Sequence, residues 1–246
     1  MDLDRFFIDY KEPDLFIFLT DSCLIIPEKN EIYSLKDIGD FERILSLSGL
    51  KGDCGIVLNS RDFIFNFLEF DRLPFNENKK KEIIEWRLEK LFPEKLKNYI
   101  HEYINLKNNK VLSILFKKET HDRLNDVFTK NSLNMIDLRN TTLSLLSKIS
   151  KEKNNVDFLI EVDSSFITMT FFNSREPFFI RKFEIYDENE LVDEMKKIIN
   201  YVKTNSSLSI NTYSVYYSCE SDKSIVNSIK LIDIELVKTY DFKDLL

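Results

Sequence analysis

The sequence predicts a mixed α/β fold, in which helices cover mixed β-sheets, and three observations carry this prediction. Short apolar runs recur along the chain in pairs that are separated by turn residues, which is typical of paired strands. Longer segments with apolar residues three or four positions apart lie between these pairs and predict amphipathic helices. The 246 residues are 43% apolar and 31% charged, a balance typical of globular proteins with a buried core.

In the first half of the chain, paired strands alternate with helices. The pairs are expected at 15–19 with 24–27, at 55–58 with 63–70, and at 99–106 with 111–116. The second pair is interpreted as a hairpin that turns at 60–62. Helices are expected over 35–47, 76–91 and 119–129, and a short strand at 135–138 precedes a helix that ends near 148.

The polar stretch 150–155 contains no apolar residue and is interpreted as a linker. It divides the chain into an N-terminal lobe, 1–149, and a C-terminal lobe, 156–246. The C-terminal lobe is expected to hold strands at 157–162, 166–172 and 177–185, a helix at 191–202, a strand at 213–217, a helix at 221–229 and a strand at 232–237.

Charge and cysteine content exclude several classes of protein. The formal net charge of −7 disfavours binding to nucleic acid, because an acidic protein repels the phosphate backbone. No apolar run is long enough to cross a membrane, and the N-terminus lacks a signal-peptide pattern, so we expect a cytoplasmic protein without direct membrane insertion. The three cysteines have no metal-type spacing and are odd in number, so we expect no disulfide framework and no metal site.

The segment around Trp86 resembles the corresponding segment of the PilM family. PilM proteins are actin-like assembly proteins of type IV pili, and their relatives include the cytoplasmic domain of GspL-type secretion proteins. In this segment Leu73 and Pro74 end a strand, a helix combines acidic residues with Trp86, and Phe92 and Pro93 follow. The resemblance implies a two-lobed actin-like (ribonuclease H-like) fold.

The resemblance continues in the second half and extends from about residue 14 to 240. The segment 158–165 lies where the family has its second phosphate-binding hairpin, and 175–181 resembles the returning strand with its arginine. The segment 215–219 lies where the family has a strand that leads into a double glycine near the adenosine. These correspondences make Glu161, Asp163, Ser164, Ser218 and Cys219 the nucleotide-site positions of this chain.

At these positions the chain departs from the family, because all four of its glycines precede residue 56. Tight phosphate-binding turns use glycine, which has no Cβ and tolerates a positive φ angle. Asp163 replaces the expected glycine of the second hairpin and brings a carboxylate to the place of a phosphate. Ser218 and Cys219 replace the double glycine. The nucleotide site is therefore interpreted as degenerate, with no cofactor and no catalysis.

The chain is also shorter than the family pattern. The family inserts a subdomain between the returning strand and the next long helix, whereas here the strand that ends at 185 is followed almost at once by the helix at 191. The sequence thus predicts an actin-like fold with one subdomain missing. That subdomain forms one wall of the nucleotide cleft.

The resemblance implies a non-catalytic scaffold of a type IV pilus or type II secretion apparatus. It would bind the cytoplasmic tail of a PilN-like inner-membrane protein as an extended peptide, at the inner face of the membrane. The residues of this groove are not predicted. Two alternatives stay open: an ATP-binding actin-like protein that retains nucleotide, and an unrelated metal-dependent α/β enzyme that uses acidic residues.

Three features, the acidic pair on the strand, a tryptophan and a cysteine, have both a structural and a functional interpretation. Glu161 and Asp163 lie two residues apart and so share one side of a strand, as a metal-binding pair or, the interpretation we favour, as exposed remnants of a degenerate loop. Trp86 is interpreted as a core residue rather than an interface anchor. Cys54 is interpreted as a buried structural residue rather than a nucleophile.

Overall fold

The computed structural model describes residues 13–20, 22–36, 38–92, 96–145, 156–163, 166–173, 176–206, 208–217 and 223–241. Their contacts group the chain into a larger unit, residues 1–61 with 128–246, and a smaller unit, residues 62–127. The described residues form three sheets, two of which combine parallel and antiparallel pairs. The predicted mixed α/β fold is confirmed.

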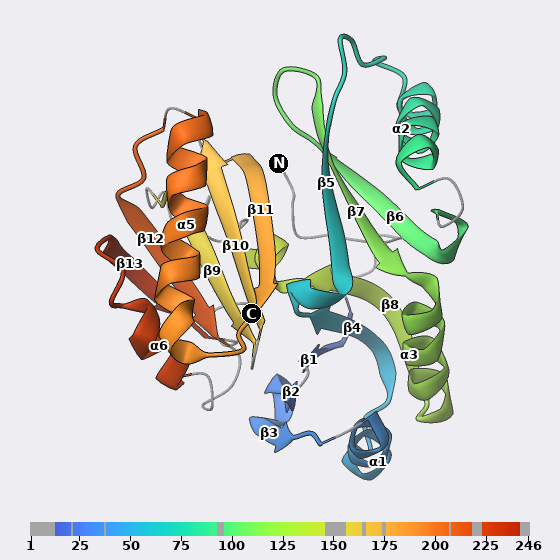
Figure 1. Ribbon diagram of the computed structural model, residues 1–246. Coiled ribbons are helices and arrows are strands. Elements are labelled where there is room, and N and C mark those ends of the chain that lie inside the picture. The colour runs from blue at the N-terminus through green and yellow to red at the C-terminus, as the bar shows by residue number, and fades with distance from the viewer. Residues whose placement is uncertain are drawn as a thin grey trace. The chain divides into compact units, whose positions relative to one another are not determined.

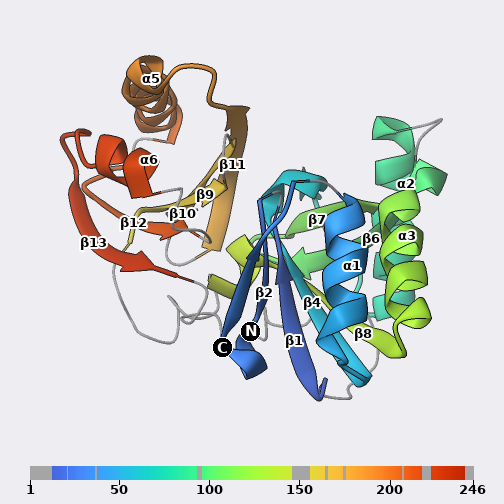
Figure 2. The same cartoon turned by 90° about the horizontal axis from the view of Figure 1, so that it is seen from below.

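The first sheet of the larger unit has the order β3-β2-β1-β4-β8. Its strands are β1 (Leu15–Leu19), β2 (Cys23–Ile26), β3 (Glu31–Ser34), β4 (Gly52–Leu58) and β8 (Leu133–Asn140). The predicted hairpin of β1 and β2 is confirmed, whereas β3 was not predicted. Helix α1 (Ile38–Ser48) buries Phe41, Ile44 and Leu45 alongside this sheet (Figure 2). It ends at Gly49, whose φ of 63° favours glycine.

The second sheet of the larger unit has the order β11-β10-β9-β12-β13. Its strands are β9 (Phe158–Asp163), β10 (Phe166–Asn173), β11 (Glu176–Glu184), β12 (Thr212–Tyr217) and β13 (Glu235–Tyr240). Helices α5 (Glu188–Ser206) and α6 (Lys223–Ile229) lie over the same face of this sheet (Figure 1). The predicted apolar side of α5 is buried in the core, at Leu191, Met195, Ile198, Ile199 and Val202. Only residues 185–187 join β11 to α5, as the shortened fold requires.

The smaller unit contains an antiparallel sheet of order β5-β7-β6. Its strands are β5 (Phe63–Glu69), β6 (Tyr99–Asn105) and β7 (Lys110–Lys117), and α3 (Lys118–Lys130) follows β7 directly. Helix α2 (Glu77–Leu91) packs Ile84 and Leu88 against one face of the sheet. The side chain of Asn76 caps this helix by accepting a hydrogen bond from the Lys79 amide at 3.0 Å.

The predicted hairpin of β4 and β5 is wrong. β4 pairs in parallel with β1 and β8, whereas β5 pairs with β7 in the sheet of the smaller unit. Residues Ser60–Asp62, interpreted as the turn, form a 3-10 helix. Two adjacent strand-like runs look like a hairpin in the sequence, because local periodicity identifies strands but does not identify their partners.

The predicted linker at 150–155 and the residues 93–95 lie outside the described part of the chain. The lobe boundaries 1–149 and 156–246 therefore stay predictions. The grouping by contacts places both five-stranded sheets in the larger unit. Within the described residues, no helix combines the length and the apolar character that a membrane span requires.

Candidate functional site

The nucleotide-site positions Glu161 and Asp163 lie in a polar cluster inside the larger unit. Three segments that are distant in sequence meet there: the loop after β4, the helical residues 141–145 that follow β8, and the end of β9. We call this group the carboxylate cluster. Its members are Asn59, Ser60, Thr141, Thr142, Glu161 and Asp163, and each is at least 97% buried.

The carboxylate of Glu161 accepts hydrogen bonds from three donors. The Ser60 amide lies 2.8 Å from Oε1, and the Thr142 hydroxyl lies 2.5 Å from Oε2. The Thr141 hydroxyl also donates to Oε1. Hydrogen bonds to an ionised acceptor are stronger than neutral ones, and a buried carboxylate is tolerated only when it has such partners.

The neighbouring residues extend the cluster on both sides. The amide nitrogen of Asn59 donates to the Asp163 carboxylate. The hydroxyl of Ser60 contacts the hydroxyl of Thr142 at 2.7 Å and the side chain of Asn140 at 3.0 Å. These contacts join the loop after β4 to the end of β8 within one sheet, and both to β9 of the other sheet.

A basic side chain holds the same loop from the second sheet. The ammonium group of Lys182, on β11, donates to the carbonyl oxygens of Arg61 at 2.9 Å and Ser60 at 3.4 Å. The guanidinium of Arg61 in turn lies 5.5 Å from the ring centre of Phe166, on β10. The segment 59–61 is therefore held by acceptors on β9 and by a donor on β11.

This geometry corrects one interpretation and leaves others untested. Glu161 and Asp163 do share one side of β9, but they are 2% and 3% exposed rather than exposed remnants. No local pattern marked their donors, because Ser60, Thr141 and Thr142 resemble ordinary turn and helix-start residues. Ser164, Ser218 and Cys219 lie outside the described residues.

The described residues contain no group of three or more metal-ligating side chains. The two carboxylates of the cluster are directed to amide and hydroxyl donors instead, and Lys182 bonds to carbonyl oxygens. Chemically, the neutral donors of Ser60, Thr141 and Thr142 can hold one anionic group. The Glu161 carboxylate is that group.

The structure also locates the other candidate residues. Trp86 is 53% exposed, with the ammonium of Lys90 3.6 Å from its ring centre, so the core interpretation is wrong. Cys54 is a fully buried free thiol, as expected, and burial raises the pKa of this thiol. Cys23 is disulfide-bonded, although the cysteine count and spacing had predicted no disulfide framework.

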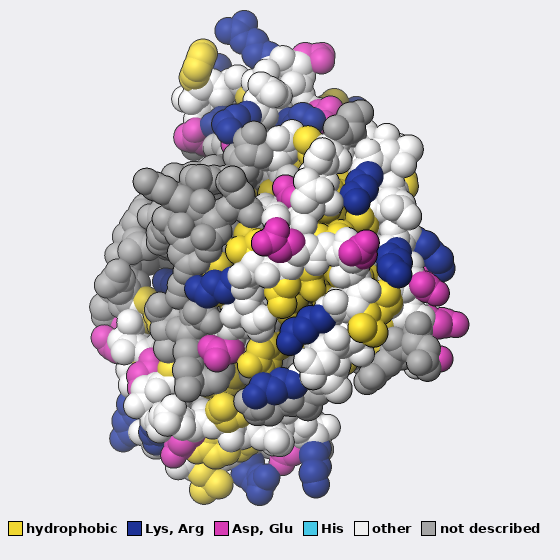
Figure 3. All heavy atoms as spheres, turned by 90° about the vertical axis from the view of Figure 1, so that its left-hand side faces the viewer, with side chains coloured by type: hydrophobic (Ala, Val, Ile, Leu, Met, Phe, Trp, Pro, Cys, Tyr) yellow, Lys and Arg dark blue, Asp and Glu magenta, His cyan; other side chains and the backbone are white. Residues whose placement is uncertain are grey.

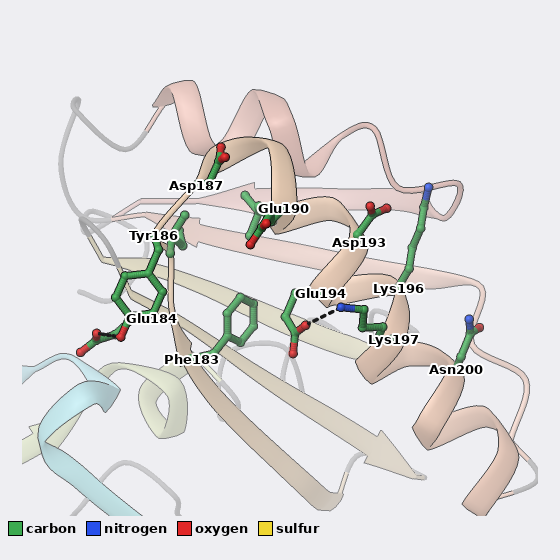
Figure 4. Close-up of a pocket in the computed structure, with 12 residues that line it drawn as sticks. Phe183, Glu184, Tyr186, Asp187, Glu190, Asp193, Glu194, Lys196, Lys197 and Asn200 are labelled. Carbon is green, nitrogen blue, oxygen red and sulfur yellow. Dashed lines mark hydrogen bonds and ion pairs between the residues drawn. The ribbon is translucent and has the colours of Figure 1, made fainter.

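An acidic pocket of about 620 Å³ lies where β11 passes into α5. Figure 4 shows the carboxylates of Glu184, Asp187, Glu190 and Asp193 around its wall. The hydroxyl of Tyr186 donates to Glu184 at 2.5 Å, which raises the pKa of this tyrosine. On the side of the molecule that carries α5 and α6, charged groups of both signs lie among apolar side chains (Figure 3).

Comparison with known proteins gives similarities of structure alone. No family model and no curated protein matches the chain. The structure is similar to PilM of the PilM–PilN type IV pilus biogenesis complex, with a TM-score of 0.70 at 9% identity over 96% of this chain and 90% of that chain. It is also similar to the cytoplasmic domain of EpsL, an inner-membrane component of the type II secretion system of Vibrio cholerae, with a TM-score of 0.56 at 7% identity over 82% of this chain and 81% of that chain.

A third similar structure is a Bacteroides thetaiotaomicron protein with an actin-like ATPase fold and unknown function. The TM-score is 0.54 at 16% identity, over 94% of this chain and 93% of that chain. At such low identities, structural similarity establishes the fold and not the function. The protein therefore has an actin-like fold.

Proposed function

We propose that the chain is a non-catalytic scaffold of a type IV pilus or type II secretion apparatus and that it binds the cytoplasmic tail of a PilN-like membrane protein. One observation carries the proposal: the similarity to PilM extends over 96% of this chain and 90% of that chain. PilM is the partner of PilN in that complex, and the similar EpsL domain belongs to an inner-membrane component.

The carboxylate cluster supports the non-catalytic part of the proposal. A nucleotide phosphate needs free backbone and hydroxyl donors, and in this chain the Ser60 amide and the hydroxyls of Thr141 and Thr142 already bind Glu161. A phosphate would also meet the negative charges of Glu161 and Asp163 at close range, which is strongly unfavourable. Both effects disfavour ATP.

The shortened connection supports the same proposal. Only residues 185–187 join β11 to α5, where the resemblance to PilM implies an inserted subdomain, so this chain would lack one wall of a nucleotide cleft. A peptide partner has no need of that wall. An extended tail can pair with the backbone of an exposed strand, and the side chains of alternate residues enter pockets beside it.

Calorimetry tests the proposal directly. Synthetic peptides that match the cytoplasmic tails of the membrane proteins encoded beside this chain are titrated into the folded protein. We expect one peptide to bind one-to-one with micromolar or tighter affinity, and a scrambled peptide of equal composition to give no signal. The proposal fails if no tail peptide binds to a sample that is folded by circular dichroism.

A further inference from the structure

Apart from any peptide binding, the carboxylate cluster stabilises the larger unit by linking its two sheets. We propose that Glu161 is a built-in anionic ligand, which joins the two five-stranded sheets and occupies an anion site that a small free carboxylate can fill in its absence. This inference is independent of the identity of the partner.

The groups bonded at Glu161 come from both sheets. Glu161 belongs to β9 of one sheet, whereas its donors Ser60, Thr141 and Thr142 belong to segments that end β4 and β8 of the other sheet. The carboxylate thus bridges the two sheets, as a bound anion would. The covalent attachment to β9 makes the bridge permanent.

The donors around Glu161 are all neutral groups. One backbone amide and two hydroxyls surround the carboxylate, and none of these groups carries a charge. Glu161 is 2% exposed, so water supplies little of its stabilisation. Neutral donors directed at one point are the usual lining of an anion site, whereas a structural ion pair would place a cation there.

The burial of these donors makes the loss of their acceptor costly. The hydroxyls of Thr141 and Thr142 are almost fully buried, as is the amide of Ser60. If the Glu161 carboxylate is removed, these donors stay buried and lose that acceptor. A buried donor without an acceptor costs more free energy than an exposed donor, which can bond to water instead. The vacated space would then favour one small carboxylate, which restores the charge that the parent protein already holds beside Asp163.

Removal of the side chain gives the test. The Glu161→Ala variant of the full chain is expected to melt roughly 10 °C below the parent protein, because a buried hydrogen-bonded network loses its central acceptor. Sodium formate or acetate should raise this melting temperature in a saturable manner, by several degrees. Sodium chloride at the same ionic strength should not.

Two control variants test whether the response to formate is specific to the vacated Glu161 site. Glu235→Ala removes an exposed carboxylate from β13 of the same sheet and should respond equally to formate and chloride. Thr142→Val in the Glu161→Ala background removes one donor and should weaken the response to formate about tenfold in concentration. A Glu161→Ala protein that melts like the parent, or that gains nothing specific from formate, overturns the proposal.

A milder variant covers a failure of Glu161→Ala to fold. Glu161→Gln keeps the volume but lacks the charge, so hydrogen exchange of the Ser60 amide should become about tenfold faster. The amide of Val226, in α6, serves as the reference. Folding of Glu161→Ala only in the presence of formate supports the proposal, whereas unchanged exchange at Ser60 in Glu161→Gln contradicts it.

Discussion

Two glutamates, one in each unit, show opposite ways to bury a carboxylate. Glu161 of the larger unit is 2% exposed and accepts hydrogen bonds from an amide and two hydroxyls. Glu102, on β6 of the smaller unit, is half-buried, and its pKa is raised because burial removes water from its carboxyl group. Lys81, His101 and the Tyr103 backbone amide oppose this rise without cancelling it.

The hydrogen-bond donors around a buried acid, rather than the extent of its burial, decide whether the acid stabilises the fold. The more deeply buried residue, Glu161, has the more complete set of partners and is expected to stabilise the larger unit. The less buried residue, Glu102, is expected to destabilise the smaller unit at neutral pH, because its charged form is incompletely solvated. The following predictions test this difference.

The largest effect is expected when Glu161 keeps its charge and loses its hydroxyl donors. The double variant Thr141→Val, Thr142→Val leaves one amide for a buried carboxylate and should lower the free energy of unfolding by about 4 kcal/mol. Urea denaturation measures the change. The control Thr129→Val, at an exposed position of α3, should change stability by less than about 0.5 kcal/mol. Equal effects of the two variants would mean that the hydroxyls do not stabilise Glu161.

The second largest effect is expected at α2 of the smaller unit, where one substitution is made on the buried side and one on the exposed side. Ile84 is fully buried against the sheet, whereas Trp86 is 53% exposed. Ile84→Ala should therefore cost about 3 kcal/mol, since it leaves a cavity. Trp86→Ala should cost under about 1 kcal/mol, although it removes the larger side chain. Chemical denaturation of both variants measures these losses of stability. A larger loss for Trp86→Ala than for Ile84→Ala would mean that Trp86 is a core residue.

A smaller effect, with a defined dependence on pH, is expected at Glu102. The pKa of this group is raised in the folded state. The charged carboxylate therefore lowers stability at a pH above the folded-state pKa, and this loss is absent at a pH below the unfolded-state pKa, where the group is protonated in both states. Glu102→Gln should stabilise the protein at pH 7 by less than about 1 kcal/mol, because solvent screens a half-buried group. The gain should fade as the pH falls toward the ordinary glutamate range. A gain that grows on acidification would contradict the assigned cause.

Much of the local structure could be predicted from the sequence, because its signals are short in range. The helix expected over 76–91 begins after the cap at Asn76. The strands expected at 99–106 and 111–116 are joined at Asn108 and Asn109, both of which have a positive φ. The buried side of α5 followed from helical spacing. The strand β3 was missed, since its four residues alternate in burial without a strongly apolar run.

Pairings between distant segments were not predictable in the same way. The sequence placed β4 and β5 in one hairpin, but they belong to different sheets. For the same reason Glu161 was expected at the surface. Its donors lie 19, 20 and 101 residues away, and no local pattern marks Thr141, Thr142 and Ser60 as its partners. The sequence therefore pointed to Glu161, whereas its hydrogen-bond donors became visible only in the structure.

The last prediction is an effect of zero: magnesium-ATP at several millimolar should leave the melting temperature of the protein unchanged. A ligand stabilises a fold only as far as its concentration exceeds its dissociation constant. The donors of the carboxylate cluster are bound to Glu161, and two negative charges about 4 Å apart repel by roughly 4 kcal/mol at an effective dielectric constant near 20. That repulsion alone lowers affinity about a thousandfold.

Differential scanning fluorimetry measures this effect, with magnesium chloride as the reference. Absence of ATP turnover would be weaker support, since a protein can hold a nucleotide without hydrolysing it. The Asp163→Asn variant sharpens the result, because it keeps the volume of the side chain and removes one charge beside Asn59. A clear rise with magnesium-ATP in the parent protein that this variant abolishes would favour the nucleotide-retaining alternative. No rise in either protein would leave Glu161 as the anion of this site.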